Sequence, residues 1–392
     1  ECHADAIHPG YGFLSENATF ARRCQEENII FIGPDPETME AMGDKISARI
    51  KMIEAGVPVV PGTQENLKSV EEAVELCNKI GYPVMLKASM GGGGKGMRLI
   101  HSAEEVEEAY TTAKSESLSS FGDDTVYLEK FVEEPHHIEF QILGDKHGNV
   151  IHLCERECSV QRRNQKIVEE TPSVFLEMNT RLQVEHPITE EVVGVDLVKE
   201  QIKVADGQVL QLKQKDIQQR GHAIECRICA EDTEMNFMPS PGIIKQITEP
   251  NGIGVRIDSY VYEGYEIPIY YDPMIGKLIV WATNREYAIE RMRRVLHEYK
   301  LTGVKNNISY LRAIMDTPDF VEGHYDTGFI TKNGEHLQQC IMRTSERAEN
   351  IAMIAAYMDY LMNLEENRGD ATDNRPISKW KEFGLHKGVL RI

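Results

Sequence analysis

The segment EMNTRLQVEHP, residues 177–187, constrains the fold of this chain more than any other stretch of its sequence. It follows the apolar run 174–176 and carries a polar residue at every second position, namely Glu177, Asn179, Arg181, Gln183 and Glu185. Side chains two apart in an extended strand point to the same face. We therefore expect a strand that presents these side chains in one row. The residue types suit a site that holds a metal ion, an anion and a proton acceptor, with a solvated strand face as the alternative.

The length and charge of the chain limit the kinds of partner that we expect. Its 392 residues are enough for two or three domains with sizeable cores. The net charge of −20 argues against nucleic acid and anionic membranes as partners, and no apolar run is long enough to cross a membrane. Basic residues nevertheless gather at Arg162, Arg163 and Lys166, and Lys87 and Lys95 flank a glycine run. These clusters predict binding of a small anion, with a solvated surface patch as the alternative.

Eight cysteines are scattered along the chain, too few for a disulfide scaffold. This usage is typical of a reducing compartment, so we expect a cytoplasmic protein. The pairs Cys154/Cys158 and Cys226/Cys229 lie in strand-like runs. Neither run has the glycines that usually let a chain bend around zinc, so a zinc site is disfavoured.

Apolar runs and capping signals predict an α/β (α+β) chain. Residues 29–32 are typical of a short strand, and a helix is expected over 37–55 with Gly56 as its stop. Ser69 and Glu72 form a capping box that begins another helix. The expected domains are 1–58, 59–131, 132–335 and a helical tail over 336–392. Apolar residues at helical spacing in that tail favour core packing over a partner helix.

The glycine run GGGGKG, residues 91–96, joins two expected strands. It lacks the strand-to-helix setting of a Walker loop and does not match GxGxxG. Four consecutive glycines let the backbone approach a ligand closely, and their N–H groups can surround phosphate oxygens. Because Lys87 ends the preceding strand, a phosphate-binding loop is favoured over a plain flexible hairpin.

Eight segments occur in a characteristic order along the chain. They are HPGYGFLSEN, MGDK, KASMGGGGKGM, EKF, QRRNQK, EMNTRLQVEHP, GHAIECRICAED and YYDPMIGKL. Together they resemble the biotin carboxylase family, the ATP-grasp component of acetyl-CoA, propionyl-CoA and pyruvate carboxylases. The resemblance implies an ATP-grasp fold with the remnant of a Rossmann-like N-terminal domain over 1–58, a glycine-loop lid over 59–131 and a mixed C-terminal domain.

The resemblance also implies a role for each matching residue. The implied ATP-binding residues are Lys45, Lys87, Gly91, Gly92, Gly93, Gly94, Glu129, Lys130, His137, Gln161 and Asn164. The implied ligands of magnesium or manganese are Glu177 and Asn179. Bicarbonate is held by Lys166, Arg181, Gln183 and the Val184 backbone, and biotin lies near Arg227 and Tyr11. The implied catalytic residues are the general base Glu185 together with Arg227, Arg181 and Lys166.

The implied reaction is the first half-reaction of a biotin-dependent carboxylase. Glu185 takes the proton of bicarbonate as bicarbonate attacks the γ-phosphate of ATP, which yields carboxyphosphate. Carboxyphosphate releases CO₂ and phosphate, phosphate takes the N1′ proton of biotin, and Arg227 stabilises the enolate-like oxygen. The implied partners are a second copy of the chain, a biotin carboxyl carrier protein and a carboxyltransferase subunit. Acetyl-CoA carboxylase of fatty acid biosynthesis is one setting, and the acyl acceptor stays open.

Three features depart from the family pattern. The sequence begins inside the family's N-terminal domain, so we expect the opening βαβ unit to be missing. It passes directly from EETPS to VFLEMN, where the family has a helix and a strand that carries another magnesium carboxylate. We expect that residues between Ser173 and Val174 are omitted from the sequence. Asn164 replaces a histidine common in the family, and because it keeps a hydrogen-bond donor we expect tuning rather than loss.

Two other functions remain open at this point. An ATP-grasp ligase or a carbamoyl-phosphate-type synthetase shares the lid and the metal-binding strand, but it lacks the arginine within ECRIC, residues 225–229. A non-catalytic structural subunit follows if the strand before Val174 is truly absent from the protein.

Overall fold

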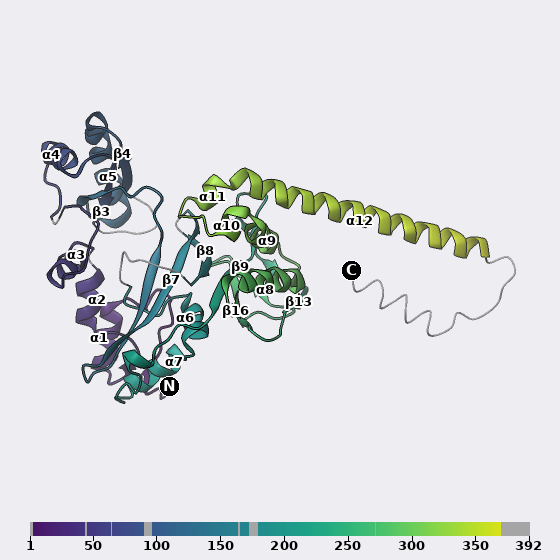
Figure 1. Ribbon diagram of the computed structural model, residues 1–392, viewed down its shortest axis with the longest axis horizontal. Coiled ribbons are helices and arrows are strands. Elements are labelled where there is room, and N and C mark those ends of the chain that lie inside the picture. The colour runs from purple at the N-terminus through teal and green to yellow at the C-terminus, as the bar shows by residue number, and fades with distance from the viewer. Residues whose placement is uncertain are drawn as a thin grey trace. The chain divides into compact units, whose positions relative to one another are not determined.

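The computed structural model in Figure 1 describes residues 3–43, 45–63, 65–89, 96–163, 165–171, 179–270 and 272–369. Within these ranges, the side chains of 43, 45–47, 121, 343–349 and 362–369 are not described. The chain divides into two compact units, 1–337 and 338–392. The first unit contains the sheets and the candidate site.

The first elements form a small α/β unit. Strands β1 (Ala6–Ile7) and β2 (Ile30–Phe31) pair in parallel, and helix α1 (Ala18–Glu26) joins them. Asn17 caps α1, because its side chain accepts a hydrogen bond from the Phe20 backbone N–H at 2.8 Å.

The region predicted as a helix over 37–55 is helical on both sides of residue 44, which lies outside the described residues. Helix α2 spans Pro36–Gly43 and helix α3 spans Lys45–Glu54. Gly56 follows with a φ of +76°, a left-handed conformation that glycine adopts without strain. The predicted stop is therefore confirmed.

A three-stranded antiparallel sheet and two helices form the next part of the chain. The strand order is β4 (Met97–Ile100), β3 (Val84–Ala88) and β5 (Val126–Lys130). Helix α4 (Val70–Ile80), the 3₁₀ turn η1 (Ala103–Glu105) and helix α5 (Val106–Phe121) share a buried apolar core with the sheet. The Ser69 hydroxyl accepts from the Glu72 backbone N–H at 3.2 Å, so the predicted cap of α4 is confirmed. Strands β3 and β4 are the two that the glycine run 91–96 was expected to join.

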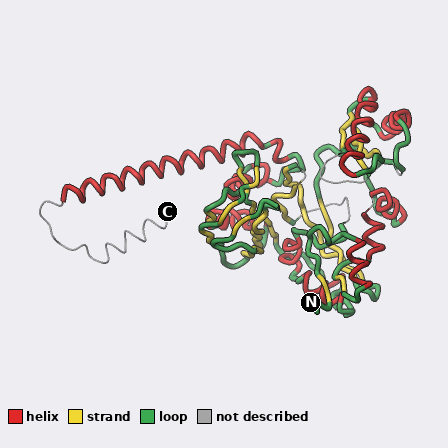
Figure 2. The backbone as a smooth tube through the Cα atoms, turned by 180° about the vertical axis from the view of Figure 1, so that it is seen from behind, coloured by secondary structure: helices red, strands yellow, loops and turns green. Residues whose placement is uncertain are grey.

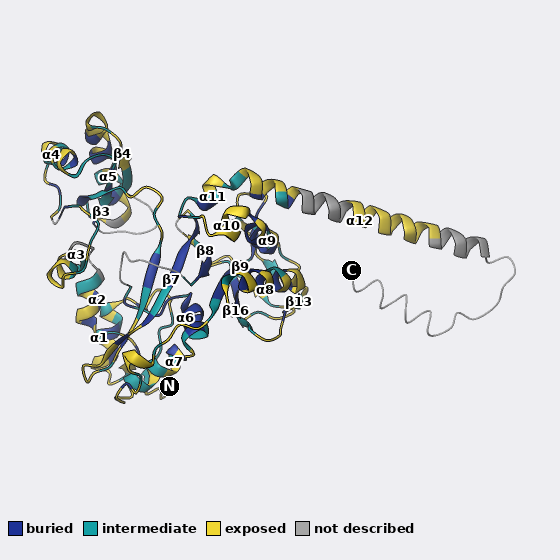
Figure 3. Ribbon diagram, in the orientation of Figure 1, coloured by how far each residue is buried: buried dark blue, intermediate teal, exposed yellow. Residues whose placement is uncertain are grey.

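The largest sheet has six antiparallel strands in the order β14-β16-β9-β8-β7-β6. Their bounds are β6 (Ile138–Gly144), β7 (Val150–Arg162), β8 (Gln165–Glu170), β9 (His222–Cys229), β14 (Val255–Ser259) and β16 (Met274–Ala282). Helix α6 (His186–Val193) packs on β7 and β9, and helix α8 (Arg285–Glu298) packs on β9 and β16. Figure 3 shows the resulting burial along these strands, and Figure 2 shows them from behind.

Shorter elements complete the first unit. They are α7 (Leu197–Ala205), η2 (Gln214–Asp216), β10 (Glu231–Asp232), β11 (Met238–Pro239), β12 (Gly242–Ile243), β13 (Gln246–Thr248), β15 (Glu266–Ile267), β17 (Lys300–Thr302), α9 (Ile308–Asp316), α10 (Pro318–Glu322) and α11 (Phe329–Lys332). The pairs β10/β11, β12/β15 and β13/β17 are antiparallel.

Helix α12 (Gly334–Gly369) carries the chain into the second unit. It covers residues 336–369 of the helical tail that was predicted over 336–392. Ile351, Ile354 and Met358 are each more than half exposed, at 57%, 60% and 57%. The described part of the second unit therefore provides no core against which these apolar side chains pack, contrary to the expected core packing. No helix among the described residues is both long and apolar enough to span a bilayer.

Candidate active site

The described part of the segment EMNTRLQVEHP is not a strand. Residues 179–185 are irregular, turn at 184–185 and lead directly into α6. Pro187 lies in the first turn of this helix, where its fixed φ favours a helix start. The chain therefore bends where we expected it to stay extended, and the predicted strand is wrong for 179–185. Glu177 lies outside the described residues.

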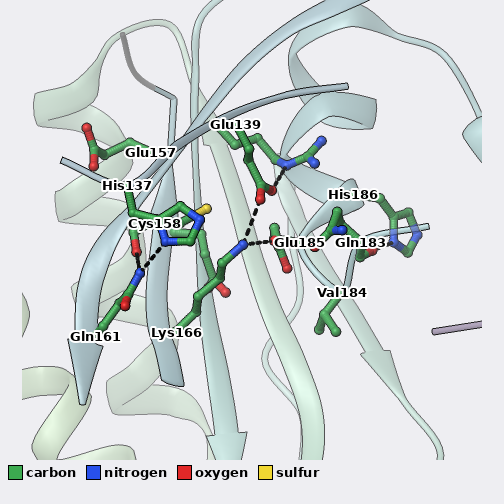
Figure 4. Close-up of polar contacts among 12 residues, drawn as sticks. His137, Glu139, Glu157, Cys158, Gln161, Lys166, Gln183, Val184, Glu185 and His186 are labelled. Atoms are coloured by element: carbon green, nitrogen blue, oxygen red, sulfur yellow. Dashed lines mark hydrogen bonds and ion pairs between the residues drawn. The ribbon is translucent and has the colours of Figure 1, made fainter. Parts of the chain in front are cut away.

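Lys166 on β8 joins two buried carboxylates. Its Nζ donates to Glu139 Oε2 at 2.7 Å and to Glu185 Oε1 (Figure 4). Glu139 projects from β6, and its other oxygen accepts from Arg156 Nε on β7 at 2.7 Å. Arg156 is only 1% exposed. Three neighbouring strands thus bring a fixed lysine against the carboxylate at the start of α6.

Arg227 on β9 holds the second oxygen of the same carboxylate. Its Nη2 lies 2.8 Å from Glu185 Oε2, and its Nε donates to Glu169 Oε1 on β8 at 2.6 Å. Glu185 itself is 1% exposed. Both of its oxygens are therefore held by cations from the central strands, and the structure brings together three of the four predicted catalytic residues.

The pKa values of this cluster follow from burial and pairing. Burial alone would raise the pKa of Glu185, but Lys166 and Arg227 lower it well below the usual glutamate range. Burial opposes the charge of Lys166, yet the Cys158 thiol and the Glu185 and Glu139 carboxylates raise the pKa of this lysine. Glu185 is consequently ionised at neutral pH, which is the form that a proton acceptor requires.

Two further carboxylates lie on β8 and β9, close to Arg227. Glu169 on β8 and Glu225 on β9 are register partners in the sheet and are fully buried. Within the part of the chain that the structure describes, Glu169 Oε2 and both carboxylate oxygens of Glu225 have no hydrogen-bond partner. Burial raises the pKa of Glu169 and raises that of Glu225 well above the usual range.

Arg181, the fourth predicted catalytic residue, is anchored from the N-terminal part of the chain. Its Nε donates to Glu16 Oε2 at 2.8 Å, and Glu16 Oε1 accepts from the Thr180 backbone N–H at 2.9 Å. Gln183 is buried, and its Nε2 has no hydrogen-bond partner among the described residues. A donor without a partner in the core can bind an incoming acceptor without first breaking another bond.

The Val184 carbonyl is held by a lysine that we did not single out from the sequence. Lys277 Nζ on β16 donates to Val184 O at 2.9 Å and lies 3.3 Å from Asp258 Oδ2. The same ammonium is 5.7 Å from the centre of the Tyr11 ring. Tyr11, the aromatic residue expected near biotin, is therefore close to the turn at 184–185.

The predicted nucleotide residues form two groups. Lys87 Nζ on β3 lies 2.5 Å from Glu129 Oε2 on β5, the paired strand. The Lys130 side chain donates to the Gly81 and Tyr82 carbonyls at 2.8 and 3.0 Å, so its ammonium is engaged by the backbone that precedes β3.

The second nucleotide group lies on the large sheet. Gln161 Nε2 is 2.7 Å from His137 Nδ1 and 2.7 Å from Cys158 O (Figure 4). His137 directly precedes β6, and Gln161 lies near the end of β7. Gly91, Gly92, Gly93, Gly94 and Asn164 lie outside the described residues, and for Lys45 only the backbone, at the start of α3, is described.

One described group has the spacing of a metal site, but its chemistry does not suit magnesium. Ligand atoms of Glu139, Cys158 and Glu185 lie within 4.8 Å of one another. The ammonium of Lys166 already bridges the two carboxylates, and magnesium prefers oxygen ligands to a thiol. Asn179, a predicted magnesium ligand, is partly buried and lies in the same segment as Glu185. Glu177, the other predicted ligand, lies outside the described residues.

A cavity of about 1210 Å³ adjoins this cluster. Its lining includes Glu139, Arg156, Asn179, Arg181 and Gln183. Sequence analysis missed Glu139, Arg156, Glu169, Glu16 and Lys277 as members of the site. Glu16 lies in HPGYGFLSEN and Lys277 lies in YYDPMIGKL, so the motifs contained two of these residues without revealing their contacts.

Several known proteins are similar to this chain. The biotin carboxylase of Nostoc sp. is 49% identical over 368 residues, with 84% of this chain and 82% of the relative covered. A pyruvate carboxylase subunit of Methanothermobacter thermautotrophicus is 49% identical over 366 residues, with 83% of this chain and 74% of the relative covered.

Solved structures agree with this likeness. One is the biotin carboxylase domain dimer of the Hydrogenobacter thermophilus 2-oxoglutarate carboxylase, in complex with MgADP, ADP and bicarbonate. It has a TM-score of 0.81 and 46% identity, and 85% of this chain and 83% of that chain are covered. The biotin carboxylase–β,γ-ATP complex from Campylobacter jejuni has a TM-score of 0.81 and 44% identity, with 84% and 82% covered.

The comparisons also bear on the junction between Ser173 and Val174. The alignment with the Nostoc protein spans 368 positions. Only 84% of the 392 residues of this chain take part in it, which is fewer than 368 residues. The relative therefore has residues that lack a counterpart in this chain. The family model of the carbamoyl-phosphate synthase L chain ATP-binding domain matches in two stretches, 44–176 and 173–213. These stretches meet where we expected residues to be omitted.

Models of two further domains match the first unit on either side of this ATP-binding domain. The biotin carboxylase N-terminal domain matches residues 1–39, and the biotin carboxylase C-terminal domain matches residues 225–332. These two matches exclude a plain carbamoyl-phosphate synthetase, which shares only the ATP-binding part. Taken with the identity to curated relatives over most of the sequence, they show that the chain belongs to the biotin carboxylase family.

Proposed function

We propose that this chain catalyses the ATP-dependent carboxylation of carrier-bound biotin by bicarbonate, through carboxyphosphate. The observation that carries the proposal is the buried Glu185 carboxylate, whose two oxygens accept from Lys166 and Arg227. Family membership supports the same reaction, and a related crystal structure contains MgADP and bicarbonate.

Glu185 is the proposed general base. Its lowered pKa keeps it ionised, so it can accept the bicarbonate proton while a bicarbonate oxygen attacks the γ-phosphate of ATP and ADP leaves. Bicarbonate would share the cations that now hold Glu185. Losing part of these hydrogen bonds makes the carboxylate more basic at the moment when a proton must be taken.

The proposed bicarbonate site is built from Lys166, Arg181, Gln183 and the Val184 backbone. Lys166 and Arg181 supply positive charge, and the unpartnered Gln183 Nε2 supplies a neutral donor. Charge-assisted hydrogen bonds favour an anion in a buried setting. This set supports a small oxyanion as substrate.

Arg227 and Tyr11 form the proposed biotin side. After carboxyphosphate releases CO₂, the phosphate accepts the N1′ proton of biotin, and Arg227 stabilises the negative oxygen of the ureido group. Arginine suits this role because it remains charged at any working pH. The CO₂ carbon then bonds to N1′.

The proposed nucleotide contacts are Lys45, Lys87 and the loop 91–94 on the phosphates, with Glu129, the Lys130 backbone, His137, Gln161 and Asn164 around the nucleoside. Magnesium, with Glu177 and Asn179 as its proposed ligands, would neutralise charge on the phosphates when bound. We assign it no step, because the described residues do not complete an oxygen ligand set.

The proposed setting is a multisubunit carboxylase. The proposed partners are a second copy of the chain, a biotin carboxyl carrier protein and a carboxyltransferase subunit, with the cytoplasm as the proposed compartment. One relative belongs to a pyruvate carboxylase, and another is the small subunit of a 2-oxoglutarate carboxylase. Acetyl-CoA carboxylase of fatty acid synthesis is a further setting, so we leave the acyl acceptor open.

Glu185→Gln tests the assignment of the base. We expect biotin-dependent ATP cleavage to fall by roughly 10²–10⁴-fold, because the amide cannot accept the proton. ATP affinity should stay within about twofold, because the nucleotide contacts are elsewhere. Phosphate release with bicarbonate and free biotin, together with calorimetric ATP titration, provides the two measurements.

Glu286→Gln, an exposed change on α8, is the matched control and should behave as wild type. Full turnover in the Glu185→Gln variant would rule out Glu185 as the general base. A wild-type protein that binds ATP but shows no biotin-dependent cleavage would overturn the proposed function and favour a non-catalytic subunit.

A further inference from the structure

Lys277 is a buried cation to which sequence analysis assigned no role. It is 3% exposed and lies on β16, within the motif YYDPMIGKL. A lysine is rarely buried unless its ammonium has partners, because desolvation of the charge is costly. The position of Lys277 in the sheet and its contacts therefore indicate which groups its ammonium binds.

The register of the large sheet places Lys277 in a row of charged residues. Lys277 pairs with Arg227 on β9 and with Asp258 on β14. Residues that are directly opposite in neighbouring antiparallel strands share a face of the sheet. Arg227 and Lys277 therefore point toward the same turn, at 184–185.

The two cations hold that turn at adjacent residues. Arg227 binds the Glu185 side chain at 2.8 Å, and Lys277 Nζ donates to the Val184 carbonyl at 2.9 Å. Val184 O belongs to the peptide group from which Glu185 begins. Fixing this carbonyl fixes the peptide plane, and with it the direction in which the proposed base leaves the backbone.

We propose that Lys277 is a positioning residue for the bicarbonate-binding turn, acting through its hydrogen bond to the Val184 carbonyl. This inference rests on the proposed function and adds a residue to it. Lys277 needs no contact with bicarbonate, because it holds the backbone that carries Gln183, Val184 and Glu185. Two backbone hydrogen bonds are described at the helix start, His186 N to Gln183 O at 3.3 Å and Ile188 N to Glu185 O at 3.1 Å, and neither involves the Val184 carbonyl that Lys277 holds.

Asp258, the carboxylate beside Lys277, allows two explanations of the buried lysine to be separated. Lys277 either anchors the turn or only neutralises Asp258. Lys277 lies 3.3 Å from Asp258, so it could serve only to neutralise that side chain. Asp258 has a second partner, because Arg256 Nε donates to it at 2.8 Å. Asp258→Asn keeps the lysine and its bond to Val184, whereas Lys277→Met removes the bond and keeps most of the side-chain volume.

The test compares wild type, Lys277→Met, Asp258→Asn and the exposed control Lys245→Met in the full chain. Kinetics give KM for bicarbonate and for ATP separately, and hydrogen exchange monitored by mass spectrometry covers residues 180–190. We expect Lys277→Met to raise KM for bicarbonate about tenfold with KM for ATP within about twofold, since only the turn loses its anchor. Exchange should become faster in 180–190 and stay unchanged in lid peptides.

Asp258→Asn and Lys245→Met should leave KM for bicarbonate and exchange in 180–190 close to wild type. Unchanged exchange in Lys277→Met, or an Asp258→Asn variant that reproduces its whole effect, would overturn the inference. A wild type without bicarbonate-dependent turnover would instead remove the proposed function, and the exchange of 180–190 would still decide whether Lys277 holds the turn.

Discussion

Four buried glutamates around the candidate site differ in the number of cations that they contact. Glu185 accepts from Lys166 and Arg227, and Glu139 accepts from Arg156 and Lys166. Glu169 accepts a hydrogen bond with one carboxylate oxygen, and neither carboxylate oxygen of Glu225 has a hydrogen-bond partner among the described residues. The pKa is lowered only for Glu185, whereas burial raises it for the other three. The pKa values of identical side chains thus shift in opposite directions, because burial and pairing with cations act against each other.

Glu225→Gln should remove a pH dependence of stability. The pKa of Glu225 is raised in the folded state, so its stabilising contribution is complete below the ordinary glutamate pKa and is lost as pH rises through the folded value. A neutral amide does not titrate. We therefore expect the stability of the variant, relative to wild type, to increase as pH rises from acidic to alkaline.

Urea unfolding over this pH range measures the effect. Glu286→Gln, at an exposed site, is the control and should follow the wild-type curve throughout. The groups that face Glu225 are Glu169, Lys277, Arg227 and Glu185, and all are retained in the variant. A difference between wild type and Glu225→Gln that is independent of pH would contradict the raised pKa.

At the scale of elements, helix starts were predictable, whereas the site turn was not. Ser69 caps α4 as expected, because the capping hydrogen bond joins residues three apart. The alternation in 179–185 predicted a strand with equal clarity, yet these residues turn into α6. Pro187 was the local signal that a helix begins, and the alternating pattern outweighed it in our interpretation.

Ser69→Ala should destabilise the lid through this cap. Loss of the hydroxyl leaves the Glu72 backbone N–H without its acceptor, at a cost of about 1 kcal/mol. Hydrogen exchange should accelerate in the first turn of α4, and thermal unfolding should begin slightly earlier. Ser120→Ala, near the exposed end of α5, is the matched control. Equal exchange of α4 in both variants would show that the cap contributes nothing.

For the whole molecule, the order of the large sheet assembles the site. The neighbouring strands β9, β8, β7 and β6 carry Arg227, Lys166, Arg156 and Glu139, and α6 begins at Glu185 over them. The second unit, 338–392, contributes none of the contacts described for this cluster. The site therefore belongs to the first unit.

A chain that ends at Met342 should retain the fold and the nucleotide affinity of the first unit. The compact unit ends at Leu337, and the described apolar side chains from Ile351 to Leu361 are exposed, so their removal leaves no cavity. We expect an unchanged ATP Kd and less concentration-dependent association, because an exposed apolar stripe favours association. Calorimetry and light scattering measure these quantities. Loss of ATP binding would show that the second unit is needed for the site.

The sequence by itself determined the family and the fold class, and it named Lys166, Glu185 and Arg227, which the structure brings together. Motif order and local capping depend on residues close in the chain, so no tertiary information was needed for them. Only the tertiary structure decided that Glu185 is shared by Lys166 and Arg227, that Glu16 binds Arg181, and that Lys277 binds the Val184 carbonyl. These contacts join residues 19, 42, 165 and 93 positions apart. Strand order and register bring such residues together, and no local pattern encodes that distance.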